Sequence, residues 1–128
     1  MRQHRPTLSA QSVLAALQSG DAESGEAMAR QLLRTKPRDA EVLHLCGAAC
    51  LMLGKAAQAR ELFKRALGVR KDASCYLNLA LAEQSLGDTP ASSEALRNCL
   101  RLQPGNAKAA NNLANLLDHQ RHYAEAEQ

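Results

Sequence analysis

Asparagine side chains cluster in the C-terminal part of the chain and recur at one long spacing. Asn111, Asn112 and Asn115 follow one another closely beside Lys108, and Asn78 lies 34 residues before Asn112. A carboxamide offers both a donor and an acceptor, so it can pair with the N–H and C=O of an extended peptide backbone. These residues are predicted to bind peptide. Polar residues on a solvated helix face, without a ligand, are the alternative explanation of the same pattern.

No arrangement of residues that could perform catalysis is apparent. The four histidines, His4, His44, His119 and His122, are scattered, and no Ser-His-Asp or paired-carboxylate arrangement accompanies them. Asp118 and His119 are adjacent, but adjacent residues on a helix point about 100° apart and do not cooperate. The chain also lacks a glycine-rich phosphate loop. We therefore predict that this protein is not an enzyme and uses no cofactor.

Four cysteines raise the question of a disulfide or a metal site. Cys46 and Cys50 are four residues apart and so share a helix face, but a single C-x-x-x-C pair lacks the second close pair of a zinc site. Buried cysteine also behaves as a small apolar residue in a reducing compartment. The prediction is no metal site, with Cys46, Cys50 and Cys99 in the core and Cys75 partly exposed.

Charge and composition exclude two classes of partner. Of 128 residues 16 are basic and 13 acidic, and the basic residues are dispersed along the sequence. Only 2% of the residues are aromatic, which leaves few platforms for stacking bases, so no nucleic-acid partner is predicted. The short basic start, Arg2, His4 and Arg5, is followed by no secretory or membrane-spanning apolar run. We predict no membrane partner and a cytoplasmic location.

The elements that position these residues follow from an internal period. Gly20, Gly54 and Gly87 are spaced by 34 and 33 residues, and each precedes an alanine-rich amphipathic stretch. Such a period, with two helical patterns in each unit, indicates stacked helical hairpins. The predicted repeats cover residues 6–39, 40–72, 73–106 and an incomplete 107–128, within a single domain of residues 1–128.

Capping residues and glycines set the expected helix boundaries. Acceptors for the first amides of a helix stand at Asp21, Asp39, Asp72, Asp88 and Asn106. The expected helices cover residues 8–19, 22–35, 40–53, 56–69, 73–86, 89–102 and 107–119, with an eighth beginning at 122 after a turn at Arg121-His122. The second repeat is one residue short near residues 69–72, which predicts an altered turn there.

Residues at fixed places within the repeats carry a family resemblance. The second repeat contains Leu43, Cys46-Gly47, Cys50, Gly54, Ala59, Phe63 and Ala66, and the third contains Tyr76, Leu79-Ala80, Gly87, Leu96 and Pro104. This pattern resembles the tetratricopeptide repeat (TPR). The resemblance implies an all-α, right-handed solenoid of about three and a half helix-turn-helix repeats, in which the first helix of each repeat lines a concave groove.

The resemblance also bears on the asparagines. Asn78 and Asn112 occupy the same position of successive repeats, which is similar to the asparagine ladder of the TPR region in bacterial O-linked N-acetylglucosamine transferase-like proteins. At the equivalent places the first two repeats have Gln11 and Leu45, so only two rungs of such a ladder are present.

A second comparison within the family concerns the carboxylate clamp that holds acidic chaperone tails. Asn78 and Lys108 match clamp positions, whereas His44 and Ala48 stand where Lys and Asn are expected, and Asn112 where Arg is expected. With one firm cation, a carboxylate would lose its multidentate charge-assisted bonds. A peptide site comprising Asn78, Lys108, Asn111, Asn112, Asn115 and His44 is therefore predicted to act chiefly through amides.

These features predict a noncatalytic scaffold that binds a partner protein or an extended peptide in its concave groove. The alternative is the N-terminal, substrate-presenting TPR region of a larger enzyme, such as a glycosyltransferase or sulfotransferase. The fourth repeat stops before its second helix is complete, which suggests a fragment of a longer protein. Its exposed apolar end would allow end-to-end self-association.

Overall fold

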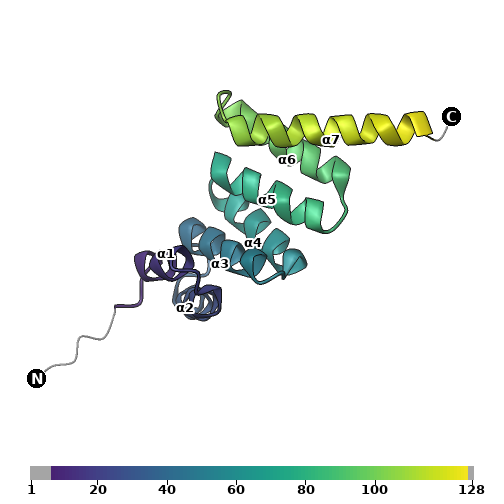
Figure 1. Cartoon of the computed structure of the whole chain (residues 1–128). Coiled ribbons are helices and arrows are strands. Elements are labelled where there is room, and N and C mark those ends of the chain that lie inside the picture. The colour runs from purple at the N-terminus through teal and green to yellow at the C-terminus, as the bar shows by residue number, and fades with distance from the viewer. Residues whose placement is uncertain (1–6, 127–128) are drawn as a thin grey trace, which may run out of the picture. The chain divides into compact units, whose positions relative to one another are not determined.

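The computed structural model of the protein describes residues 7–126, and within that range it contains only helices and no strand (Figure 1). The helices are α1 (Ala10–Gln18), α2 (Ala22–Thr35), α3 (Ala40–Met52), α4 (Ala56–Val69), α5 (Ala73–Ser85), α6 (Thr89–Leu102) and α7 (Ala107–Ala126). The all-α helical repeat expected from the sequence is confirmed. The basic start of the chain, Arg2, His4 and Arg5, lies outside the described residues.

Three turns repeat one geometry, because a glycine ends the first helix of each hairpin. Gly20, Gly54 and Gly87 have φ values of 86°, 77° and 77°, in the left-handed region that other residues adopt only with strain. In each turn the amide after the glycine donates to a carbonyl of the preceding helix. These bonds are Asp21 N to Ala16 O at 2.8 Å, Lys55 N to Cys50 O at 2.8 Å and Asp88 N to Glu83 O at 2.9 Å.

The predicted helix caps are confirmed. Each of the five side chains accepts a hydrogen bond from the backbone N–H three residues further along. The acceptor and donor pairs are Asp21 and Ser24 at 3.2 Å, Asp39 and Val42 at 3.1 Å, Asp72 and Cys75 at 3.1 Å, Asp88 and Ala91 at 3.2 Å, and Asn106 and Ala109 at 2.9 Å. These five residues therefore fix the start of five helices through local bonds.

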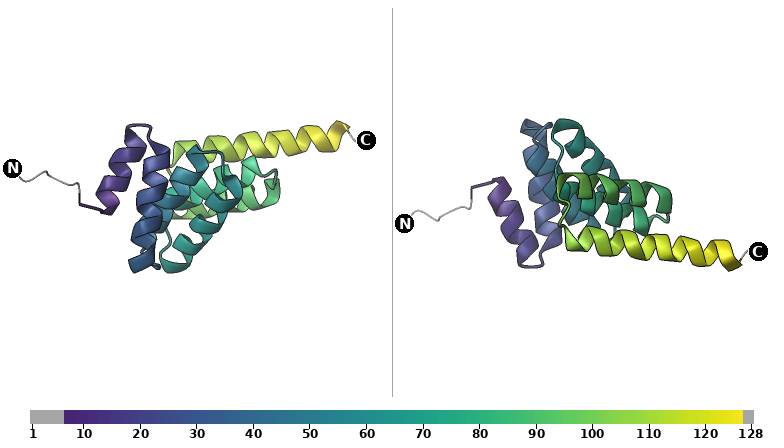
Figure 2. Two further views of the ribbon diagram at one scale, coloured as in Figure 1. Left: turned by 90° about the horizontal axis from the view of Figure 1, so that it is seen from below. Right: turned by 90° about the horizontal axis from the view of Figure 1, so that it is seen from above.

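The expected eighth helix, beginning at His122, is wrong. α7 runs without a break from Ala107 to Ala126 (Figure 2). Arg121 stands where the earlier hairpins have a glycine, so the left-handed turn is not formed. Side chains four residues apart also support a continuous helix, since Arg121 Nε lies 3.4 Å from Glu125 Oε1 and His122 Nε2 lies 3.9 Å from Asp118 Oδ2.

The sequence predicts a single domain of residues 1–128, and the structure divides it into two compact units. Unit 1 is Met1–Arg70, with α1 to α4, and unit 2 is Lys71–Gln128, with α5 to α7. The boundary falls within the turn for which the sequence predicts an alteration. Each unit has its own packed core.

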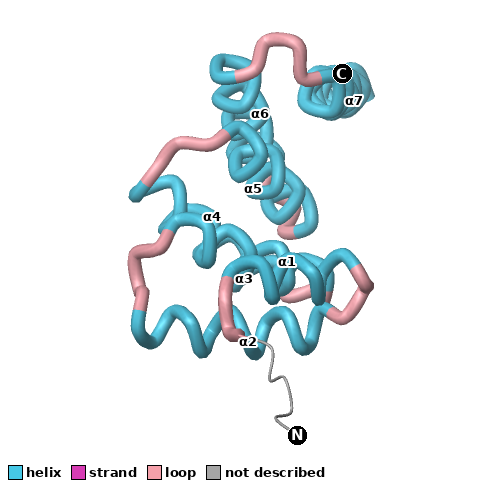
Figure 3. The backbone as a smooth tube through the Cα atoms, turned by 90° about the vertical axis from the view of Figure 1, so that its left-hand side faces the viewer, coloured by secondary structure: helices cyan, strands magenta, loops and turns pink. Residues whose placement is uncertain are grey.

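Both cores combine a small residue with a large one where helices cross. In unit 1 the ring of Phe63 on α4 is fully buried, and a Cβ added to Gly47 on α3 would lie 2.6 Å from Phe63 Cε1. In unit 2 the fully buried residues include Ala80 on α5 and Leu96 on α6. Helices that follow one another in sequence pack side by side within each unit, as Figure 3 shows for α5 and α6.

Within the described range, none of the helices combines the length and the apolar character that crossing a bilayer requires.

Candidate functional site

The predicted amide residues of α7 lie on one face of that helix. Lys108, Asn111, Asn112 and Asn115 have the spacing i, i+3, i+4 and i+7, which places their side chains along a single stripe. Lys108, Asn111 and Asn115 are exposed, and Asn112 is half-buried. The stripe therefore presents carboxamide donors and acceptors to solvent, with one cation in the first turn of the helix.

Asn78 lies on α5, in the same unit as these residues, and is half-buried. α5 packs against α6, and α6 packs against α7. Unit 2 thus contains every amide of the predicted site. We refer to Asn78, Lys108, Asn111, Asn112 and Asn115 as the amide face.

His44 belongs to unit 1, where it lies on α3. Its ring packs edge-on against that of Phe63, with the two centroids 5.7 Å apart and the ring planes at 75°. The half-buried imidazole therefore contributes to the packing of the α3–α4 hairpin.

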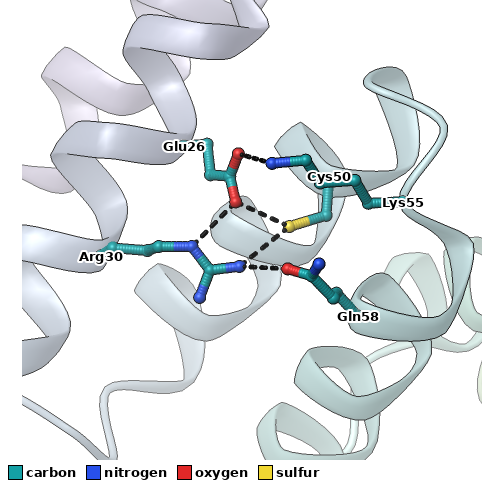
Figure 4. A network of polar contacts seen from close by, with 5 residues as sticks. All are labelled: Glu26, Arg30, Cys50, Lys55 and Gln58. Atoms are coloured by element: carbon teal, nitrogen blue, oxygen red, sulfur yellow. Dashed lines mark hydrogen bonds and ion pairs between the residues drawn. The ribbon is translucent and has the colours of Figure 1, made fainter.

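A polar network that was not anticipated from the sequence joins α2 to the following hairpin (Figure 4). The carboxylate of Glu26 accepts from Lys55 Nζ at 2.7 Å through Oε1 and from Arg30 Nε at 2.8 Å through Oε2. Arg30 Nη2 donates in turn to Gln58 Oε1 at 2.7 Å, and the thiol of Cys50 lies 3.5 Å from both Arg30 Nη2 and Glu26 Oε2. The network consequently connects α2, α3, the α3–α4 turn and α4.

Electrostatics favours the ionised form of Glu26. Hydrogen bonds from Lys55 and then from Arg30 lower the pKa of this carboxyl group from its ordinary value of 4.5 to about 2, although burial acts in the opposite direction. The same contacts raise the pKa of Arg30 and of Lys55. Among the residues of unit 1 that the structure describes, Glu26 is the one buried acid, and both of its cations are partly exposed. A carboxylate held so firmly is suited to joining helices rather than to transferring protons.

The cysteines are more buried than the sequence predicts. Cys46, Cys50 and Cys99 lie in the core as expected, but the expectation that Cys75 is partly exposed is wrong, since only 1% of it is accessible. Asp72 caps α5 by accepting from the backbone N–H of Cys75, and Ala73 in the same first turn is buried as well. Burial raises the pKa of the Cys75 thiol to about 12 and also raises that of Cys99. Neither thiol is suited to act as a nucleophile.

Comparison with protein families identifies the repeat. Models described as tetratricopeptide repeat match residues 16–80, 73–106 and 95–128. Together they cover the chain from α1 to its C-terminal end. None of the curated proteins matches the sequence significantly.

Known structures share the arrangement of helices. The first TPR domain of human RPAP3 is similar with a TM-score of 0.84 and 15% identity, over 91% of this chain and 92% of that one. The second TPR domain of human RPAP3, in complex with the HSP70 peptide SGPTIEEVD, has a TM-score of 0.78 and 17% identity, over 83% and 89%. A mutant O-GlcNAc transferase of Thermobaculum terrenum has a TM-score of 0.77 and 26% identity, over 91% of this chain but 23% of that one.

Proposed function

The chain belongs to the tetratricopeptide repeat family, and we propose that it is a noncatalytic scaffold that binds an extended peptide or a partner protein. The amide face of unit 2 is the proposed site. On α3 of unit 1, the half-buried His44 is proposed as a separate contact for a peptide.

One observation carries this proposal. Asn111, Asn112 and Asn115 form an amide stripe along α7 together with Lys108, and three of these four side chains are exposed to solvent. Amides at consecutive helical turns can pair with successive peptide groups of an extended backbone, because each supplies a donor and an acceptor. The stripe therefore favours a ligand recognised by its backbone, with Lys108 available for an acidic side chain.

The similar structures support the proposal at the level of the fold. The structure of the second TPR domain of RPAP3 was determined in complex with a peptide. A helical array with this fold can therefore bind a peptide. At 17% identity, the likeness to that domain concerns the fold alone. For this chain the ligand contacts are assigned from its own amide face.

The experiment is a titration of peptides selected from a random library against wild type and a variant with Asn78→Ala and Asn112→Ala. Each lost backbone pair costs about 0.5–1.5 kcal/mol, because water competes for the same groups in the free protein. The double variant should therefore raise the dissociation constant roughly five- to hundredfold. Asn98→Ala is the matched control, since Asn98 is a half-buried amide on α6 that pairs locally with Arg101.

Lys108→Ala should behave differently from the asparagine variants. If Lys108 meets an acidic side chain, the loss of affinity should shrink as salt is added, whereas the amide contacts should be nearly insensitive to salt. Unchanged affinity in the double asparagine variant, with its helicity preserved, would reject the amide face as the site.

A second candidate function is supported by the similarity to the O-GlcNAc transferase. That protein contains a matching helical array in 23% of its length, at 26% identity. We propose as the alternative that this chain is the substrate-presenting region of a larger enzyme, such as a glycosyltransferase or sulfotransferase. The sequence encoded downstream of residue 128 distinguishes the two, because only the alternative requires a catalytic domain there.

Two further parts of the proposal concern location and self-association. A cytoplasmic location fits four cysteines that are all buried as free thiols.

End-to-end association would use α7, where Leu117 is 41% exposed and Leu113 and Leu116 are half-buried. Sedimentation equilibrium of wild type and of Leu117→Gln tests this, with a shift toward monomer expected in the variant. Nucleic acid and membranes are not proposed as partners.

A further inference from the structure

Basic side chains gather at the end of unit 1 where α2 and α4 finish. They are Arg34, Lys36 and Arg38 from the first segment and Lys64, Arg65 and Arg70 from the second, and all are exposed. No acidic residue occurs within residues 33–38 or 62–70. The fold brings Arg38 and Arg65 to one hollow, and the loop after α2 and the end of α4, near which the other four cations lie in sequence, are on the same side of unit 1 (Figure 3). We call these six residues the cationic end.

A hollow of about 340 Å³ opens within the cationic end. Its lining consists of Pro37, Arg38, Leu43, Arg65, Gly68 and Val69. Leu43 is only 1% exposed and forms the apolar wall, whereas Val69 is 42% exposed. Gly68 leaves the hollow open, since a Cβ placed there would have no atom within 4 Å. The volume lies at the small end of the range for ligand pockets, roughly 300–1,000 Å³.

Acidic side chains of the described residues lie beyond ion-pairing distance of the cations around this hollow. None of the six forms an ion pair within the part of the chain that the structure describes. Arg65 Nη2 donates to the backbone oxygen of Pro37 at 3.4 Å, which is a long bond. The nearby carboxylate of Asp39 already accepts from Val42 N, as the cap of α3. The guanidinium groups of Arg38 and Arg65 thus flank an apolar hollow and retain N–H donors for a ligand.

We propose that the cationic end is a docking site for an acidic peptide segment that carries an aliphatic side chain between its carboxylates. The aliphatic side chain enters the hollow against Leu43 and Val69, and the flanking carboxylates meet Arg38 and Arg65. A peptide fits better than a polynucleotide because the lining of the hollow contains no aromatic side chain on which a base could stack. The proposed site lies within unit 1, so it can be tested independently of the amide face.

The test uses fluorescence anisotropy with a labelled peptide in which a central leucine is flanked by glutamates and the C-terminus is amidated. The amide removes the terminal carboxylate, so binding reports on the side chains alone. Wild type should bind this peptide more weakly as salt is raised. Arg65→Gln should lower the affinity about three- to tenfold, in line with one exposed charge-assisted contact.

Two variants distinguish a docking site from general attraction between charges. Lys64→Gln makes the same change of charge one residue away on α4, outside the lining of the hollow, and should lower the affinity less than about twofold. Gly68→Leu fills the hollow without a clash at its Cβ and keeps all six cations, and it should lower the affinity by about tenfold or more. Circular dichroism confirms that each variant remains folded.

Three results would overturn the proposal. Equal losses in Arg65→Gln and Lys64→Gln would show that only net charge matters. A peptide with serine in place of leucine that binds equally well, or unchanged binding by Gly68→Leu, would leave the hollow without a role. Tighter binding of a single-stranded polynucleotide than of the acidic peptide would show that the ligand of the cationic end is a nucleic acid and not a peptide. None of these results affects binding at the amide face, which Asn78→Ala and Asn112→Ala test separately.

Discussion

The α3–α4 hairpin of unit 1 and the α5–α6 hairpin of unit 2 fill the same space with different pairs of side chains. In the first, Gly47 leaves room for the ring of Phe63. In the second, Ala80 and Leu96 occupy the equivalent positions of the repeat, and both are fully buried. The hairpin with the smaller residue on its first helix, Gly47, has the larger residue on its second helix, Phe63. The pairs show that the hairpin specifies a total volume rather than particular residues.

The surfaces of the two units differ more than their cores. Unit 1 carries the Glu26 network and the cationic end, so its polar side chains in these two places are mainly charged. Unit 2 presents the carboxamides of the amide face with the single cation Lys108. Similar total volumes in the cores therefore accompany different outer surfaces, for which we propose acidic segments as ligands of unit 1 and peptide backbone as the ligand of unit 2.

The largest expected effect follows from removing the ring that fills the α3–α4 hairpin. Phe63→Ala should lower the free energy of unfolding by about 3–5 kcal/mol, because Phe63 is fully buried and a cavity would remain. Leu117→Ala on α7 should cost less than about 1 kcal/mol, since that side chain is 41% exposed. Urea denaturation of both variants measures the difference. A loss below about 1 kcal/mol for Phe63→Ala would contradict the packing described here.

The next effect tests whether the two hairpins share one volume. Gly47→Ala should cost about 1–3 kcal/mol, because the new methyl group would lie 2.6 Å from Phe63 Cε1. Gly68→Ala is the matched control in the same unit, and should stabilise the protein by about 0.5–1 kcal/mol, because no atom opposes the methyl group and alanine favours the helix.

Combining Gly47→Ala with Phe63→Leu transfers the unit 2 pair into unit 1. The double variant should be more stable than the sum of the two single changes predicts, since leucine relieves the clash and the methyl group fills part of the cavity. Additive losses would show that the two hairpins do not share a common volume requirement.

The Glu26 network gives unit 1 a dependence on pH. Its folded-state pKa, about 2, lies below the ordinary 4.5, so the carboxylate contributes stability that is complete above about pH 4.5 and is lost as the pH falls toward 2. Glu26→Gln should cost roughly 1–2 kcal/mol at neutral pH, after allowance for solvent screening of its half-exposed cations, and progressively less in acid.

Urea denaturation at neutral pH and near pH 3 measures this difference. Glu23→Gln is the control, because Glu23 is an exposed carboxylate in the first turn of the same helix. A difference between wild type and Glu26→Gln that does not change with pH would show that ionisation of Glu26 does not support the fold.

The smallest effect concerns a buried hydroxyl that unit 2 has and unit 1 lacks. Ser92 Oγ donates to Ala80 O at 2.9 Å, whereas Ala59 occupies the equivalent place on α4. Ser92→Ala should cost about 1 kcal/mol or less. Ser93→Ala should cost nothing measurable, because Ser93 Oγ is buried and has no hydrogen-bond partner among the described residues. Thermal unfolding that ranks these two variants in the opposite order would contradict the assignment.

The parts of this structure that depend on neighbouring residues were predictable from sequence. The caps at Asp21 and Asp88 and the left-handed glycines, such as Gly54, act within one turn, and the bounds of α2, α4 and α6 agree with the expectation. The eighth helix was predicted wrongly because the repeat period was extended past Gly87 to Arg121, where no glycine permits the turn.

Features that join distant segments were not predictable. Glu26 and Lys55 are 29 residues apart, and nothing in the local sequence of either indicates the other as its partner. A glutamate on the apolar face of α2 was the one signal, since a buried acid needs a cation. The cationic end was not predictable for the same reason. Arg38 and Arg65 are distant in sequence, and they line one hollow only in the folded chain.

Chemical-shift mapping by ¹⁵N–¹H NMR tests most directly the claim that the two units recognise different chemistry. The protein is titrated in turn with a neutral peptide selected from a library and with the amidated acidic peptide. The neutral peptide should shift amide signals of α5 around Asn78 and of α7 between Lys108 and Asn115. The acidic peptide should shift those of residues 36–39 and 65–70, and only its shifts should disappear at high salt. Both peptides shifting the same set of signals would contradict the account.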